Sequence, residues 1–180
     1  MALNRTRTLR GALAGVAGVA VWAAQQPLDK RVFGVAYDDV ELLGKWVTRD
    51  PAWLPIGIAL HTFNGAAFGA IYANLSPSLP GPRPVRGVLL GLTEHLATWP
   101  ATMLIDRFHP AAGDLLQLWG NPRAFAQATW RHALFGFVLG EVERRLNPPA
   151  DAPAPIDDAS VASNGHGSAE HLVAAVGPAD

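Results

Sequence analysis

The sequence predicts an all-α fold, a membrane-embedded bundle of four transmembrane helices. Of the 180 residues, 49% are hydrophobic and only 16% are charged, which is unusual for a soluble chain. The stretch from Trp53 to Leu75 contains no Asp, Glu, Lys or Arg. At a rise of about 1.5 Å per residue, a helix of this length crosses the roughly 30 Å hydrocarbon core of a bilayer.

The first expected span covers residues 9–26. Its apolar stretch, Gly11 to Ala24, is short, so it crosses a bilayer only if Arg10 snorkels and Gln25 lies at the interface. A signal peptide is the alternative, because a basic segment precedes the run and small residues near its end would allow cleavage. We favour a retained span, since its glycine spacing matches that of the later helices.

A short amphipathic helix is expected in the first outer loop, over residues 39–48. Asp38 or Asp39 can cap it, and its apolar residues share one face. It is expected to lie on the membrane surface or to cover the bundle. A capped loop helix with no further role is an equal alternative. Hydropathy places the remaining spans at residues 53–75, 85–105 and 125–143.

The end of the chain differs from the rest in composition. Residues 147–180 are acidic and rich in Pro and Ala, and we expect a disordered tail. They contain five acidic residues and no Lys or Arg, so the net charge of -1 leaves the rest of the chain positive. Its arginines are scattered, which predicts no nucleic-acid partner. The absence of cysteine excludes disulfides and thiolate metal sites.

Charge near the ends of the expected spans predicts their orientation. Seven Lys and Arg residues lie on the side of the two termini and six on the other side. This bias predicts a multi-pass plasma (inner) membrane protein with both termini in the cytoplasm. The expected partners are the lipid bilayer and either a second copy of the chain, as a homo-oligomer, or a membrane partner protein.

Histidine and glycine recur four residues apart inside the spans. Residues at this spacing share one helix face, and glycine there lets two backbones approach closely. We therefore expect the glycines to pack the helices and the histidines to point inward, about 10–15 Å below the outer ends. The residues are Gly11 and Gly15 in the first span, His61, Gly65 and Gly69 in the second, Gly87, Gly91 and His95 in the third, and His132, Gly136 and Gly140 in the fourth.

An internal repeat is suggested by four positions near the starts of the first and third spans. They recur at a constant offset of 76, which predicts two helical hairpins repeated in parallel about an axis along the membrane normal. The pairs are Arg7 with Arg83, Arg10 with Arg86, Gly11 with Gly87, and Gly15 with Gly91.

Two further ionisable residues lie beside the histidines. Glu94 and Arg131 are each costly if they stay charged and unpaired near the centre of a bilayer. We expect them to form a buried polar pair across the third and fourth spans, with Asn64 as a nearby hydrogen-bonding group.

The motif His-x3-Gly-x3-Gly at His61 and at His132, with the loop segment LDKRVFGVAYDDVELLGK, resembles uncharacterised small four-span bacterial membrane proteins. The resemblance covers roughly residues 7–146. It implies a plasma-membrane location and a four-helix arrangement. No catalytic residue follows from it.

Three function classes remain open. In the first, the polar layer of His, Glu and Arg organises the bundle or a partner interface, without enzymatic activity. In the second, the protein carries a small solute, an ion or protons, acting as an oligomer because four helices leave little room for a path.

The third class is a membrane metal-binding protein or metalloenzyme. Here His61, His95 and His132 would hold a divalent metal, with Glu94 as a base or an extra ligand. The chain contains no nucleotide loop, nucleophile elbow or zincin motif, so we predict no catalytic residue and no other cofactor.

Overall fold

The computed structural model describes residues 4–148, and these are all-helical, with no strand among them. The all-α prediction is confirmed. The predicted tail falls almost entirely on residues 149–180, which lie outside the described residues. The elements are α1 (Arg5–Phe33), α2 (Asp39–Val47), α3 (Trp53–Leu75), the 3-10 turn η1 (Ser76–Ser78), α4 (Arg83–Thr98), the 3-10 turn η2 (Trp99–Ala101), α5 (Thr102–Phe108) and α6 (Pro122–Leu146).

Helix α1 is longer than the expected span over residues 9–26. Asn4 caps its start by accepting a hydrogen bond from the Arg7 backbone N–H, and the helix ends only at Gly34. Gly34 adopts a left-handed conformation, with φ of 65°, and returns its N–H to a carbonyl of the last turn. Pro27 lies inside the helix without ending it. Residues 27–33 therefore belong to α1, which corrects the expected end at residue 26 and places Asp29 within this helix.

One helix in the described part of the chain is long and apolar enough to cross a membrane. It runs over Trp53–Ser78, so it consists of α3 and η1, with a mean hydropathy of 1.3. Helix α3 has the bounds expected from the sequence, 53–75.

The expected continuous span over residues 85–105 is divided in two. Helix α4 ends at Thr98, the chain makes one 3-10 turn, and α5 begins at Thr102. Pro100 lies in that turn, and proline cannot donate the backbone hydrogen bond that a continuous α-helix requires. Helix α6 begins three residues before its expected start because Asn121 caps it, accepting from two backbone N–H groups.

The short helix α2 packs on α3. A Cβ atom on Gly44 would overlap the Trp53 carbonyl oxygen, and one on Gly57 would overlap the Val40 carbonyl oxygen. Backbone contact this close means that α2 covers the bundle, which was one of the two placements expected from the sequence. Asp38 caps it, accepting from the N–H groups of Val40 and Glu41.

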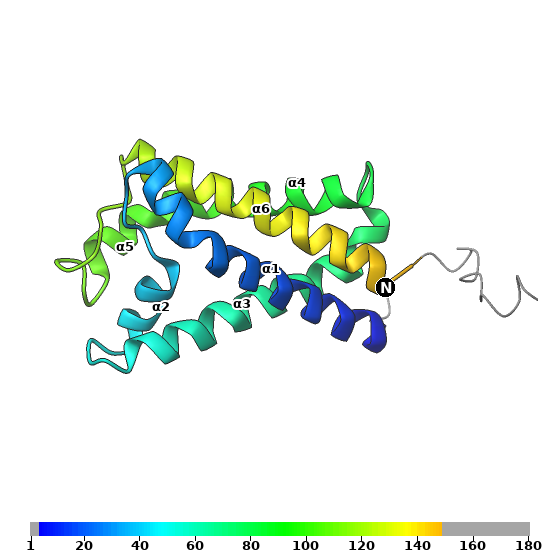
Figure 1. Ribbon diagram of the computed structural model, residues 1–180, viewed down its shortest axis with the longest axis horizontal. Coiled ribbons are helices and arrows are strands. Elements are labelled where there is room, and N and C mark those ends of the chain that lie inside the picture. Colours follow the sequence, from blue (N-terminus) through cyan, green and yellow to red (C-terminus); the bar gives the residue numbers. More distant parts are fainter. Residues whose placement is uncertain (1–3, 149–180) are drawn as a thin grey trace, which may run out of the picture. The chain divides into compact units, whose positions relative to one another are not determined.

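The long helices pack in the order α3, α1, α6, α4. Helix α1 packs on both α3 and α6, and α6 packs on α4. Figure 1 shows α1 and α6 running between α3 and α4. Within residues 4–148, consecutive helices α3 and α4 make no extensive packing contact with one another. The bundle therefore has a seam between α3 and α4 that neither helix closes.

The crossing of α1 and α3 is made by glycines. A Cβ on Gly15 would overlap the Gly65 carbonyl oxygen, and one on Gly69 would overlap the Gly11 carbonyl oxygen. Any larger residue would push the backbones apart. These four glycines therefore lie where the sequence predicted helix packing.

Glycines also form the crossing of α4 and α6. A Cβ on Gly87 would overlap the carbonyl oxygen of Gly136 and approach Gly140, and one on Gly91 would approach the His132 carbonyl oxygen. The two hairpins are thus held by the same chemistry.

The register of the two crossings differs from the predicted repeat by about one helical turn. Gly15 lies against the Gly65 carbonyl oxygen as Gly87 lies against that of Gly136. By the residue that each contacts, Gly87 is therefore equivalent to Gly15, which lies 72 positions earlier. The sequence repeat had paired it with Gly11, which lies 76 positions earlier. The repeated arginines and glycines therefore lie in two similar helices, α1 and α4. The point at which α4 crosses α6 is shifted by one helical turn from the point at which α1 crosses α3.

Candidate functional site

A cavity of about 290 Å³ lies at the seam between α3 and α4. Its walls come from α1, α2, α3, α4, η2, α5 and α6, together with Tyr37 of the loop before α2. This volume is close to the lower limit of typical small-molecule sites. The polar groups that line it are Tyr37, Asp39, His61, Asn64, Glu94, His95, Thr98, Thr102 and His132, and the larger rings are Trp22, Phe68, Trp99 and Phe135.

The three predicted histidines all line this cavity, but Trp22 separates one from the others. The Trp22 ring lies edge-on between His61 and His132, with ring centroids 5.2 and 5.0 Å away. His95 and His132 lie together, 4.7 Å apart between ring centroids. The expected convergence therefore holds for two of the three histidines.

The geometry does not support the metal alternative. No group of three or more His, Asp or Glu side chains in residues 4–148 is placed to hold a metal ion. One nitrogen of His132 and one of His95 are already hydrogen-bonded to protein oxygens. His61, His95 and His132 thus line one cavity, and metal binding by them stays a prediction.

Glu94 and His132 are placed to share a proton. His132 Nδ1 lies 2.7 Å from the Ala128 carbonyl oxygen, and since a carbonyl can only accept, Nδ1 carries a hydrogen. The other nitrogen, Nε2, lies 3.0 Å from Glu94 Oε2. Two bare lone pairs would repel at this distance, so either an imidazolium faces a carboxylate or a neutral imidazole faces a carboxylic acid.

His95 has a defined tautomer for the same kind of reason. Thr129 Oγ1 donates its hydrogen to the Phe125 carbonyl oxygen at 2.8 Å. His95 Nε2, 2.9 Å from Thr129 Oγ1, must therefore be the donor in that contact. His95 is only 1% exposed and thus acts as a fixed neutral wall beside the proton-holding pair.

Arg131 is not paired with Glu94, contrary to the sequence expectation. Its guanidinium is completely buried and binds Asp29 through two hydrogen bonds, Nε to Oδ2 at 2.6 Å and Nη2 to Oδ1 at 2.7 Å. A third nitrogen, Nη1, donates to Asp39 Oδ2 at 2.8 Å. Two carboxylates closer than Glu94 take the role that the sequence assigned to it, and Glu94 takes His132 instead.

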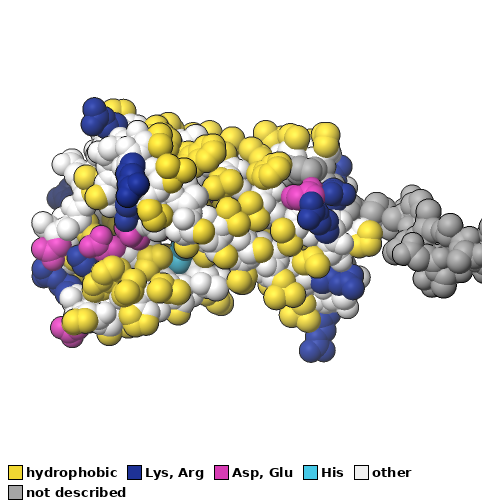
Figure 2. All heavy atoms as spheres, in the orientation of Figure 1, with side chains coloured by type: hydrophobic (Ala, Val, Ile, Leu, Met, Phe, Trp, Pro, Cys, Tyr) yellow, Lys and Arg dark blue, Asp and Glu magenta, His cyan; other side chains and the backbone are white. Residues whose placement is uncertain are grey.

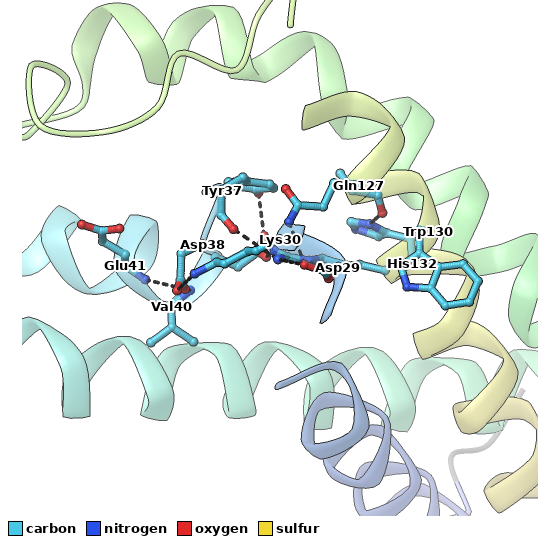
Figure 3. Close-up of polar contacts among 12 residues, drawn as sticks. Asp29, Lys30, Tyr37, Asp38, Val40, Glu41, Gln127, Trp130 and His132 are labelled. Carbon is cyan, nitrogen blue, oxygen red and sulfur yellow. Dashed lines mark hydrogen bonds and ion pairs between the residues drawn. The ribbon is translucent and has the colours of Figure 1, made fainter. Parts of the chain in front are cut away.

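The Arg131 cluster, formed by Asp29, Tyr37, Asp39, Gln127 and Arg131, joins four parts of the chain. Gln127 of α6 donates to Asp29 of α1 at 2.7 Å (Figure 3), and Arg131 also donates to the Tyr37 carbonyl oxygen at 3.2 Å. Asp39 belongs to α2. The cluster therefore fixes the loop and α2 over one end of the cavity.

The Tyr37 hydroxyl completes the cluster by donating to Asp39 Oδ1 at 2.5 Å. Burial, followed by the negative charge of Asp39, raises the pKa of Tyr37 well above its ordinary value. The phenol thus stays protonated and remains a donor at all physiological pH values.

Asp38 and Lys30 form a neighbouring ion pair outside the cavity, with 2.7 Å between Nζ and Oδ2 (Figure 3). Burial alone would raise the pKa of Asp38, but the hydrogen bond and charge of Lys30 and the backbone N–H of Glu41 lower it below its usual range. A lowered carboxyl pKa stabilises the fold above the unfolded-state value of about 4, and the contribution disappears as the pH falls through the folded-state value.

We expect Asp38→Asn to lower the free energy of unfolding by less than about 1 kcal/mol near neutral pH, since the pair is partly exposed. The difference from the unmodified protein should begin to shrink at about pH 4 and disappear only below the lowered folded-state pKa of Asp38. Unfolding measured at several pH values checks this, with the exposed Asp50→Asn as the control. A difference that stays constant with pH would show that Lys30 does not stabilise the Asp38 carboxylate.

The fold and the site together define an all-helical protein with a cavity lined by rings, histidines and carboxylates. No protein-family model, curated protein or solved structure matches this chain.

Proposed function

We propose that this is a multi-pass membrane protein whose four long helical segments cross the bilayer, with a small-molecule binding cavity at the α3–α4 seam. Large apolar side chains exposed on every long helix support the membrane location. One example from each helix is Leu13 (63% exposed), Ile58 (51%), Leu89 (53%) and Phe137 (53%). Figure 2 shows hydrophobic side chains over the middle of one face and charged side chains gathered toward its two ends. This pattern suits a surface in contact with lipid.

The pairing of the buried charged side chains is also compatible with a bundle in a membrane. Arg131 and Asp29 would be costly in lipid alone, but both are buried and paired inside the bundle. Helix α1 packs on α3 and α6 and supplies Asp29, which favours a retained first span over a cleaved signal peptide.

A topology experiment distinguishes four crossings from one. The chain has no native cysteine, so single cysteines can be introduced at Ser78, after α3, and at Gly113, after α5. If α4 and α5 complete a crossing, an impermeant maleimide should label Gly113→Cys in intact cells and Ser78→Cys only after permeabilisation, in line with cytoplasmic termini. Labelling of both from the same side would show that α4 and α5 do not complete a crossing and would overturn the four-span proposal.

The observation that carries the binding function is the cavity itself, because it lies where two consecutive helices diverge. A bundle built only for packing would close that seam, as glycines close the α1–α3 and α4–α6 crossings. The lining combines rings with a few convergent polar groups, the pattern of small-molecule sites. In this proposal the Arg131 cluster organises the bundle and the cavity beneath it holds the ligand.

We expect a cysteine at Asn64, an exposed residue in the α3 wall, to react readily with methyl methanethiosulfonate. Leu139→Cys in the core, at a position that is 0% exposed, should not react. Phe137→Cys on the apolar exterior should react slowly, because a thiolate does not form in lipid. The rates can be read by mass spectrometry. An Asn64→Cys variant as inert as Leu139→Cys would show that small molecules do not enter the cavity.

A further inference from the structure

Resting on the proposed binding function, we propose that the cavity takes a small organic cation, which binds in exchange for the proton held between Glu94 and His132. The cavity charges, the ring walls and the geometry of this pair point to the same ligand class.

The charge around the cavity is acidic. Its lining contains the carboxyl groups of Asp39 and Glu94 and neither Lys nor Arg. The nearest guanidinium, that of Arg131, is already held by Asp29 and Asp39, which leaves one negative charge in excess in the cluster. An anion would therefore meet repulsion here, and a cation would be attracted.

The aromatic walls of the cavity are suited to an organic cation that forms few hydrogen bonds. Five aromatic side chains line the cavity, and their faces attract positive charge: Trp22, Tyr37, Phe68, Trp99 and Phe135. Two of these rings already have a cation nearby, since the Arg131 guanidinium lies 5.9 Å from the Trp22 centroid and 5.4 Å from that of Tyr37. An organic cation would find the same rings from the cavity side.

Glu94 is the acceptor that remains available to a ligand. Its side chain is 38% exposed, whereas the Asp39 side chain is 14% exposed and holds two partners. With one proton present, the Glu94–His132 pair is neutral and self-satisfied. When a cation enters, the shared proton leaves to water and His132 stays as the neutral Nδ1–H tautomer. The Glu94 carboxylate then turns from the bare Nε2 of His132 to pair with the ligand. The charge in the cavity is unchanged by this exchange.

The neighbouring titratable groups do not supply that proton. His95 of α4 is fixed as a neutral donor to Thr129, and the Tyr37 phenol before α2 is held by Asp39. Asp39 of α2 and Arg131 of α6 are paired with each other. His61 of α3 lies across the Trp22 ring, and its Nε2 has no partner in the described residues. The exchangeable proton is assigned to Glu94 and His132 because His132 contacts the carboxylate that would pair with the ligand, whereas His61 lies on the other side of Trp22.

The test is calorimetric titration of the full chain in detergent with benzyltrimethylammonium, at several pH values and in buffers of different ionisation enthalpy. We expect about one proton released per cation bound, and affinity rising about tenfold per pH unit while the pair is protonated. The neutral analogue benzyl alcohol should show no such pH dependence.

The Glu94→Gln variant keeps the shape of the side chain and should lose proton release and at least tenfold in affinity for the cation. Glu41→Gln is the matched control, because Glu41 pairs with Lys45 outside the cavity lining. Thermal unfolding of both variants separates loss of binding from loss of fold. Cation binding without proton release, or equal cation binding by Glu94→Gln, overturns the exchange proposal. Binding of benzyl alcohol alone overturns it while leaving the cavity function in place.

Discussion

Replacing Arg131 with Met should destabilise the fold by about 3–5 kcal/mol, one of the two largest effects expected of any single substitution in this chain. The guanidinium is fully buried and makes two hydrogen bonds to Asp29 and one to Asp39. Its removal leaves two carboxylates, Asp29 and Asp39, without a counter-charge at the α2 end of the bundle. Water cannot stabilise the charge of Asp29 in place of Arg131, because the Asp29 side chain is only 1% exposed.

Unfolding of detergent-purified protein measures this effect, with the exposed Arg144→Met as the control. Adding Asp29→Asn and Asp39→Asn to Arg131→Met should restore part of the lost stability, because neutral side chains cost less when buried. If Arg131→Met and Arg144→Met unfold alike, the Arg131 cluster does not organise the bundle.

A Gly136→Val substitution should separate α4 from α6 and cost at least about 3 kcal/mol. Its Cβ would overlap the Gly87 carbonyl oxygen and approach the Val88 Cα, and neither backbone atom can rotate away as a side chain would. Unlike a core cavity, this overlap cannot be relieved by repacking a neighbour.

Gly113→Val is the matched control, because a Cβ at Gly113 would meet nothing within 4 Å. Gel filtration and thermal unfolding of the two variants measure the effect, and a graded series through Gly136→Ala should show increasing loss of stability. Equal stability of Gly136→Val and Gly113→Val would mean that α4 and α6 do not cross at Gly136.

Helix packing was predictable from the sequence because it depends on local periodicity. Residues four apart share a face whatever the rest of the chain does, so Gly65 and Gly69 indicated a contact before its partner was known. The partner register depends on how two helices cross, and the one-turn shift between the hairpins was for that reason not predictable.

The polar partners were harder to predict, for a physical reason that Asp29 illustrates. Its position follows Pro27, where the sequence suggested that the first helix had ended, but the left-handed cap at Gly34 carries the helix further. With Asp29 counted as part of α1, its spacing from Trp22, seven residues or about two turns, would have placed it on the inward face.

The position of Trp22 between the histidines was not indicated by any spacing within one helix. Which side chain separates His61 from His132 depends on how α1 crosses α3 and α6. Likewise, Pro100 in the sequence could have indicated a break in the helix. The cavity beside that turn could not be predicted, because it depends on the divergence of α3 and α4.

Thiol modification of Asn64→Cys, measured with a second substitution on α4, shows whether α3 and α4 face one shared cavity. Thr98 lines the cavity from the α4 side, whereas Thr93, also exposed on α4, does not. Adding Thr98→Trp should fill the seam and slow modification of the cysteine at least tenfold, while Thr93→Trp leaves the rate unchanged. Equal rates in the two backgrounds would contradict a cavity shared by α3 and α4.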